Sequence, residues 1–173
     1  IYGCLVGSEM CIRDRNSKSQ LQLIDKNFVD LIWENQPKTQ YTDIFDHPTS
    51  FAGQSRSEKL DILKKFLDQN EIDHYFVSGL DNIAWLLNLR ADDIKYTPLL
   101  YSYLLISKNN KHSLYIKESS MPEILKKEIQ TLININNIEN IGSIFNNINS
   151  SESIGLDFNS CLLYTSDAAD DGY

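Results

Sequence analysis

Helical and strand-like patterns alternate from Ser55 onwards, and this alternation limits the possible folds more than any other feature of the sequence. Ser55-Arg-Ser-Glu58 is a capping box, in which the serine oxygen accepts from a free backbone N–H and the glutamate reaches back to the cap. An apolar stripe at helical spacing follows: Leu60, Leu63, Phe66 and Leu67. The aromatic and β-branched run at 74–77, bounded by Gly79, then predicts a buried strand.

The same alternation continues to the end of the pattern. Asp81 is predicted to cap a helix that buries Ile83, Leu86 and Leu87, and a polar loop follows at 88–98. The later elements are a long strand at 99–107, a turn at 108–111, a hairpin partner at 113–117, a helix opened by a second capping box at 120–123, a helix near 141–148 and a strand at 153–158. This order predicts an α/β domain with a mixed β-sheet flanked by helices.

The residues before Ser55 predict a domain boundary. Ile24, Phe28, Leu31 and Ile32 fall on one helical face, which Pro37 ends. Residues 37–54 contain two prolines and a glycine and have no apolar period, which is typical of a linker. We therefore expect residues 16–36 to be the remnant of a preceding domain, residues 37–54 to be a linker and residues 55–160 to be one domain.

The two ends of the chain are expected to be foreign to that domain. The codons for residues 9–15 and 161–166 can be inverted repeats of each other, and both resemble translated transposase adapters from sequencing-library preparation. We interpret residues 1–15 and 161–173 as adapter-derived and exclude them from fold reasoning. All three cysteines, Cys4, Cys11 and Cys161, lie in these ends, so no disulfide or cysteine–metal site is predicted for the rest.

Charge and hydropathy exclude two classes of partner. The formal net charge is −8, of which the ends contribute −3, so residues 16–160 carry −5. A mildly acidic chain is not expected to hold a nucleic acid. No apolar run reaches the length of a membrane span, so no membrane partner is predicted either.

The residues alone point to no catalytic or metal-binding group. His47, His74 and His112 lie far apart and lack partners at ligand spacing, and no zinc-protease, phosphate-loop or nucleophile-elbow motif occurs. Asp92-Asp93 could be half of a metal site, but adjacent loop carboxylates are more often solvated or capping. The predicted catalytic set and the predicted metal set are therefore both empty.

Residues 74–98 resemble the second domain of three-domain Xaa-Pro aminopeptidases (aminopeptidase P). That family carries Leu-Asp-x-Ile-Ala-Trp-Leu-x-Asn-x-Arg-Gly-x-Asp, then Tyr-x-Pro and an aromatic-rich strand. The matching residues are Leu80, Asp81, Ile83, Ala84, Trp85, Leu86, Asn88, Arg90, Asp92, Tyr96 and Pro98. Residues 30–33 with Pro37 resemble the end of the first domain, and residues 52–60 resemble the entry to the second. Ala91 replaces the usual glycine, so the loop should be shifted or strained if that position needs a positive φ.

The resemblance implies a creatinase/prolidase N-terminal-domain-like fold in a parent enzyme that removes the N-terminal residue preceding proline. The hydrolysis would belong to a C-terminal pita-bread domain with two divalent metals, commonly manganese, which this chain would lack, so no cofactor is expected in the chain itself. The implied partners are that catalytic domain, a proline-containing peptide substrate and a second copy in a homodimer. We expect a cytoplasmic location.

At residue level the resemblance leaves several interpretations open. Trp85 is expected in the core rather than as a substrate platform, and Asn88 is expected to end its helix. Arg90 and Asp92 are the candidates for a substrate or interdomain contact. For Arg90 we favour a structural ion pair, whose partner could be Asp92, the catalytic domain or a peptide carboxyl terminus.

Two other functions compete with the peptidase segment. One is a non-enzymatic peptide- or histone-binding module of the pita-bread superfamily. In such a module the next domain lacks the metal ligands that it has in a peptidase. The other is creatinase-like or prolidase-like chemistry. Those relatives have one N-terminal domain, so the predicted remnant and linker before Ser55 argue against it.

Overall fold

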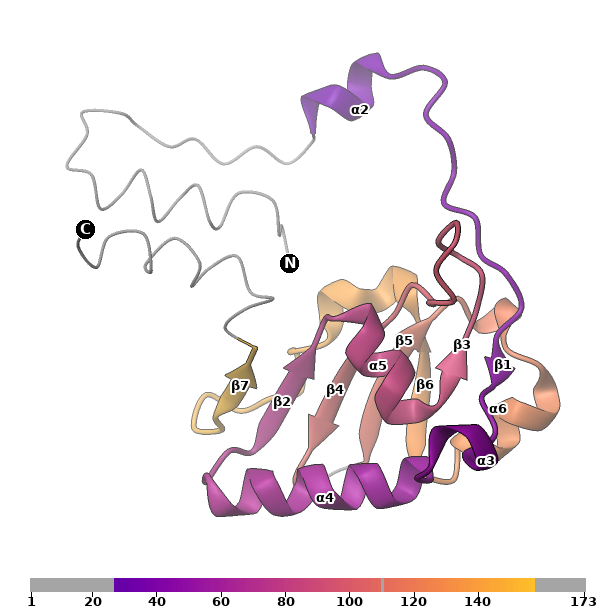
Figure 1. The fold of residues 1–173 in the computed structure, drawn as a ribbon. Coiled ribbons are helices and arrows are strands. Elements are labelled where there is room, and N and C mark those ends of the chain that lie inside the picture. Colours follow the sequence, from indigo (N-terminus) through magenta and orange to yellow (C-terminus); the bar gives the residue numbers. More distant parts are fainter. Residues whose placement is uncertain (1–26, 110, 158–173) are drawn as a thin grey trace, which may run out of the picture. The chain divides into compact units, whose positions relative to one another are not determined.

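The computed structural model describes residues 27–109 and 111–157, which fall into two compact units (Figure 1). The described part of the first unit, residues 27–40, holds helix α2 (Phe28–Ile32). This helix begins at Asn27, whose side-chain oxygen accepts from the Val29 N–H, and it buries none of its residues. The second unit begins at Tyr41 and contains all the other described elements.

The predicted capping box begins helix α4 (Arg56–Gln69). The Ser55 hydroxyl accepts from the Glu58 N–H, and the Glu58 carboxylate accepts from the Ser55 N–H at 2.8 Å. Of the predicted stripe, Leu60 and Leu67 are buried, whereas Phe66 is exposed. Helix α5 (Leu80–Leu87) follows strand β2 (His74–Val77) and buries Ile83, Ala84, Leu86 and Leu87.

A five-stranded mixed sheet forms the centre of the unit (Figure 1). Its strands are β2 (His74–Val77), β4 (Tyr103–Ser107), β5 (His112–Ile116), β6 (Ile133–Asn137) and β7 (Ile154–Leu156). Their order across the sheet is β6-β5-β4-β2-β7. Strand β4 runs antiparallel to both β2 and β5, while the outer strands β6 and β7 run parallel to their neighbours. The predicted α/β class and mixed sheet are confirmed.

Side chains alternate between the two faces of the sheet along each strand, and each face packs against its own set of covering segments. Leu104 and Ile106 of β4 join the large core cluster with α4, α5 and helix α6 (Glu123–Ile129). Leu105, between them, packs with Tyr115 and Ile144 on the other face. The covering segment there includes the 3₁₀ helix η2 (Ile138–Ser143). Figure 1 shows α4 and α5 lying across one face of the sheet.

Residues 41–54 differ from the predicted linker, because they pack onto the domain. Strand β1 (Phe45–Asp46) pairs antiparallel with β3 (Leu89–Arg90), and the short helix α3 (Thr49–Ala52) follows. Ile44 is buried, and its N–H donates to the Ser120 carbonyl at 2.7 Å. An extended segment held by single buried residues has no apolar period, so its sequence resembled a linker.

Several element boundaries also differ from the sequence expectation. Helix α6 starts after Pro122, which makes no side-chain cap, and residues 118–120 form the 3₁₀ helix η1, so the second capping box was wrong. The first strand of the hairpin starts at Tyr103 rather than residue 99. Gly79 rather than Asp81 caps α5. Strand β6 occupies part of the Asn/Ile-rich stretch, in which the sequence predicted only a later helix at 141–148.

Candidate functional site

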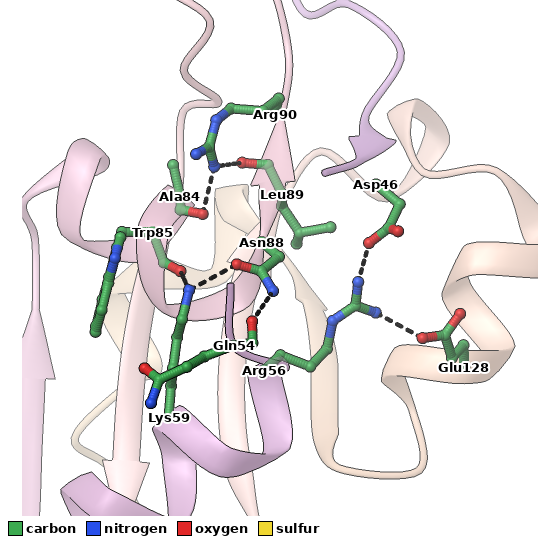
Figure 2. A network of polar contacts seen from close by, with 10 residues as sticks. All are labelled: Asp46, Gln54, Arg56, Lys59, Ala84, Trp85, Asn88, Leu89, Arg90 and Glu128. Atoms are coloured by element: carbon green, nitrogen blue, oxygen red, sulfur yellow. Dashed lines mark hydrogen bonds and ion pairs between the residues drawn. The ribbon is translucent and has the colours of Figure 1, made fainter. Parts of the chain in front are cut away.

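The family-like motif ends helix α5 at a left-handed residue. Asn88 has φ 53° and ψ 40°, is buried, and its N–H donates to the Ala84 carbonyl. Asparagine tolerates this conformation better than most residues, and it commonly ends helices. The prediction that Asn88 ends its helix is confirmed. The Asn88 amide also donates to the Gln54 carbonyl at 2.9 Å, which fixes the approach to α4 (Figure 2).

Lys59 projects from α4 into the end of α5. Its Nζ donates to the Trp85 carbonyl and to Asn88 Oδ1, each at 2.7 Å, and it lies 4.3 Å from the centroid of the Trp85 ring. Only 3% of Lys59 is exposed. Burial, together with the nearby Arg90 charge, lowers the pKa of Lys59. A buried ammonium is tolerated here because carbonyl oxygens at a helix C-terminus carry partial negative charge.

Arg56 makes a second connection from the same helix. Its guanidinium forms ion pairs with Asp46 of β1 and, at 3.0 Å, with Glu128 of α6 (Figure 2). The Arg56 side chain is buried, whereas both carboxylates are partly or largely exposed. The planar fork of an arginine can hold two carboxylates at once. Arg56 thereby joins α4 to β1, which lies 10 residues away, and to α6, which lies 72 residues away.

Arg90, the first predicted contact residue, is used inside the chain. Its Nη1 donates to the Ala84 carbonyl at 2.5 Å and to the Leu89 carbonyl at 2.8 Å (Figure 2). These partners are backbone oxygens at the end of α5, so the described contacts give Arg90 a structural role different from the carboxylate pair that the sequence favoured. Two cations, Lys59 and Arg90, thus bind carbonyl oxygens of the last turn of α5 (Figure 2).

Asp92, the second predicted contact residue, has an exposed side chain, and its backbone N–H donates to Thr42 Oγ1 at 2.8 Å. Its neighbour Asp93 is the anchor. Asp93 Oδ1 accepts from the Thr42 N–H at 2.6 Å and from the Thr42 hydroxyl at 3.0 Å, while Oδ2 accepts from the Tyr101 N–H at 2.9 Å. Nothing in the sequence distinguished the two adjacent carboxylates, because the partners of Asp93 are 51 and 8 residues away.

Trp85 was expected in the core, and this prediction was wrong. Its side chain is 57% exposed on the outer side of α5. With Ile62 and Phe66 of α4 it lines an apolar groove of about 410 Å³. The short helix turns its four apolar neighbours inward, so Trp85 is left on the remaining face, where Lys59 covers part of its ring.

The alanine in the glycine position of the motif causes no local strain. Ala91 is fully buried, and the described non-glycine residues with positive φ are Glu71, Asn88 and Tyr96. The left-handed conformations of this loop are therefore adopted by Asn88 and Tyr96, which flank Ala91, and not by Ala91 itself. The site around α5 is a set of structural clamps on the loop at 88–98 rather than a constellation of reacting groups.

Residues 27–109 and 111–157 contain neither a cluster of metal-binding side chains nor a helix that could span a membrane. No three side chains among His, Cys, Asp and Glu gather closely enough there to hold a metal ion. No helix in these ranges has both the length and the apolar character to cross a bilayer.

Comparisons with known proteins agree with the fold and the motif. Residues 35–171 match the family model for the creatinase/prolidase N-terminal domain. This range overlaps most of 161–173, which the sequence suggests is adapter-derived. It also includes residues 41–54, in accord with their packing on the domain.

Curated relatives and a solved structure extend the match. The chain is 34% identical over 116 residues to "Probable Xaa-Pro aminopeptidase P" of Leptosphaeria maculans, covering 67% of this chain and 19% of the relative. It is 35% identical over 130 residues to the protein of the same name in Ajellomyces dermatitidis, covering 75% and 20%. A crystal structure of X-prolyl aminopeptidase from Caenorhabditis elegans, titled a cytosolic enzyme with a di-nuclear active site, matches with TM-score 0.67 and 27% identity over 72% of this chain and 20% of that one. The chain thus spans about a fifth of the length of these relatives.

Proposed function

Because this chain belongs to the creatinase/prolidase N-terminal domain family, we propose that it is the non-catalytic N-terminal part of a metal-dependent Xaa-Pro aminopeptidase. The parent would remove the N-terminal residue that precedes proline. The observation that carries this proposal is the 34–35% identity to aminopeptidases of this name across the folded unit. Identity at this level spans the motif that builds the end of α5, and the C. elegans enzyme supports the same assignment.

The clamps around α5 fit an architectural role. Lys59 and Arg90 bind carbonyl oxygens, and Asp93 binds two backbone N–H groups, so these three side chains hold the end of α5 and the loop at 88–98 in place. Bonds to the backbone fix the course of the chain, which is what an architectural role requires. In this proposal these residues position a surface for the rest of the enzyme.

The described residues do not fit a two-metal centre, because no cluster of three potential ligands exists among them. We propose that a divalent metal, with manganese as the expected ion, is held by a C-terminal catalytic domain of the parent. That domain, a proline-containing peptide substrate and a second copy in a homodimer are the proposed partners. The description of the C. elegans relative as cytosolic supports a cytoplasmic location for the parent.

The test compares the intact parent enzyme with the 173-residue chain. Each is incubated with manganese and either an Xaa-Pro peptide or the matched Xaa-Ala peptide, and release of the N-terminal residue is measured by mass spectrometry. We expect release by the parent from the Xaa-Pro peptide alone, and none by the chain above a no-protein control.

Two outcomes would contradict the proposal. Release by the 173-residue chain would show that the catalytic groups lie in it. Binding of peptides by the parent without any cleavage would instead favour the peptide- or histone-binding module.

A further inference from the structure

The turn at 94–97 holds a tyrosine in a conformation that tyrosine disfavours. The Thr97 N–H donates to the Ile94 carbonyl at 3.0 Å, which places Lys95 and Tyr96 at the two central positions. Tyr96 has φ 66°. A positive φ at the third residue of such a turn is ordinarily supplied by glycine or asparagine. A bulky residue there is strained, and strain of this kind concentrates at functional sites.

This turn stands on a fixed base. Asp93, directly before it, accepts three hydrogen bonds from Thr42 and Tyr101. Ala91 and Leu100, on either side of the loop, are fully buried. The strained tyrosine is therefore presented in one place, since both ends of its loop are anchored in the domain.

The side chains of the turn point away from the domain that anchors them. Tyr96 is 92% exposed, the largest exposed fraction among the large hydrophobic side chains of the described residues. Lys95 Nζ lies 5.0 Å from the centroid of its ring. Asp92, Thr97 and Pro98 are exposed as well. An aromatic ring next to a cation fits a partner surface that offers an apolar pocket beside a carboxylate.

We propose that the loop formed by residues 94–98 is the contact through which this domain docks onto the remainder of its own polypeptide, an inference that rests on the proposed aminopeptidase parent. Tyr96 enters an apolar pocket of that part, and Lys95 faces a carboxylate at its rim. A permanent partner explains a permanently strained and exposed ring better than an occasional one. This chain spans about a fifth of the length of its relatives, so the rest of such a parent is large enough to provide the pocket and the carboxylate. Arg90, the sequence candidate for the same role, is occupied by carbonyl oxygens inside the domain.

The first test uses one substitution in two contexts. Tyr96→Asn replaces the ring with a residue that tolerates positive φ. The melting temperature of the 173-residue chain with this substitution should equal or exceed that of the original chain. In the intact parent the same change should lower the melting temperature by about 3 °C or more, because a docked contact is lost. The control is Ile124→Asn, at an 87% exposed position of α6, which should shift both proteins equally.

The second test measures amide hydrogen exchange of residues 94–99 in both proteins without any peptide. We expect exchange at least tenfold slower in the parent than in the chain. This readout does not depend on catalysis, so it stays interpretable even if the parent cleaves no Xaa-Pro peptide. Equal exchange in the two proteins would overturn the proposal, and so would a loss of stability of the isolated chain with Tyr96→Asn. Protection that appears only when a non-hydrolysable Xaa-Pro peptide is added would overturn it too, and would make the loop a substrate contact.

Discussion

Lys59 and Arg56 lie on the same helix and both lose water on folding, yet their charges are compensated differently. Arg56 faces two carboxylates, whereas Lys59 faces a backbone carbonyl and an amide oxygen. The pKa of Lys59 is lowered first by burial, so its charged form is the one that the fold disfavours. Removal of the ammonium would nevertheless leave two acceptors, the Trp85 carbonyl and Asn88 Oδ1, without this donor, which is destabilising.

This comparison predicts the effect of Lys59→Met. The methionine keeps the apolar stem but leaves the Trp85 carbonyl and Asn88 Oδ1 unpaired. We expect the free energy of unfolding in urea to fall by about 1–3 kcal/mol. Lys65→Met, at an exposed position of the same helix, is the control and should change it by less than about 0.5 kcal/mol. Equal losses in the two variants would mean that the clamp on α5 contributes nothing.

At the scale of elements, the hairpin of β4 and β5 is closed by a buried histidine. The Ser107 N–H donates to His112 Nδ1 at 3.2 Å across the end of the hairpin. Burial lowers the pKa of His112 to about 4, with Lys64 adding to the decrease and Asp61 opposing it. Only the neutral imidazole can accept this hydrogen bond, so the folded hairpin requires the uncharged form.

The hairpin should therefore weaken as the pH falls. A histidine whose pKa in the folded state lies below its ordinary value of 6.5 gives its full contribution above pH 6.5. That contribution is lost progressively between pH 6.5 and about 4, and the whole span amounts to about 3 kcal/mol. Urea titrations from pH 7.5 to 4.5 should show this decline. His112→Asn keeps an acceptor oxygen but does not titrate, so its decline should be shallower. If its profile parallels that of the original chain, His112 does not control the hairpin.

At the scale of the whole molecule, the described residues form a core on both faces of the sheet. The buried hydrophobic residues run from Ile44 to Ile144, and they cover both faces of the sheet. Residues 1–15 and 161–173 lie outside the described residues, so their suspected adapter origin stays a prediction.

Deletion of both ends tests that origin. We expect removal of residues 1–15 and 161–173 to change the melting temperature by less than about 2 °C. The reason is that adapter-derived residues did not evolve together with the core. The contrasting variant begins at Pro48 and keeps all residues up to Tyr173. It loses the buried Ile44 and the Asp46 partner of Arg56, so it should unfold at a clearly lower temperature. A comparable loss from the terminal deletion would show that at least one end is integral, and removal of residues 161–173 alone would then test the part that the family match includes.

Local patterns were sufficient wherever neighbours in sequence are also neighbours in space. The capping box at Ser55, the helix end at Asn88 and the β4–β5 hairpin all depend on residues a few positions apart, and all were predicted. The strand at 74–77 has distant partners, but its aromatic and β-branched residues are typical of strands. Strand β6 was missed because its pairing with β5 joins residues about 20 positions apart, and an Asn/Ile alternation is ambiguous without that neighbour.

The site was predictable only in outline, for the same reason. The sequence alone determined the α/β class, the mixed sheet and the motif that resembles Xaa-Pro aminopeptidases. The tertiary structure decided that Asp93 rather than Asp92 anchors the loop, that Arg90 binds carbonyl oxygens, that Trp85 lies outside the core, and that residues 41–54 belong to the domain. Each of these depends on which distant atom a side chain meets. That meeting is set by the packing of whole elements, which the spacing of residues along the chain does not encode.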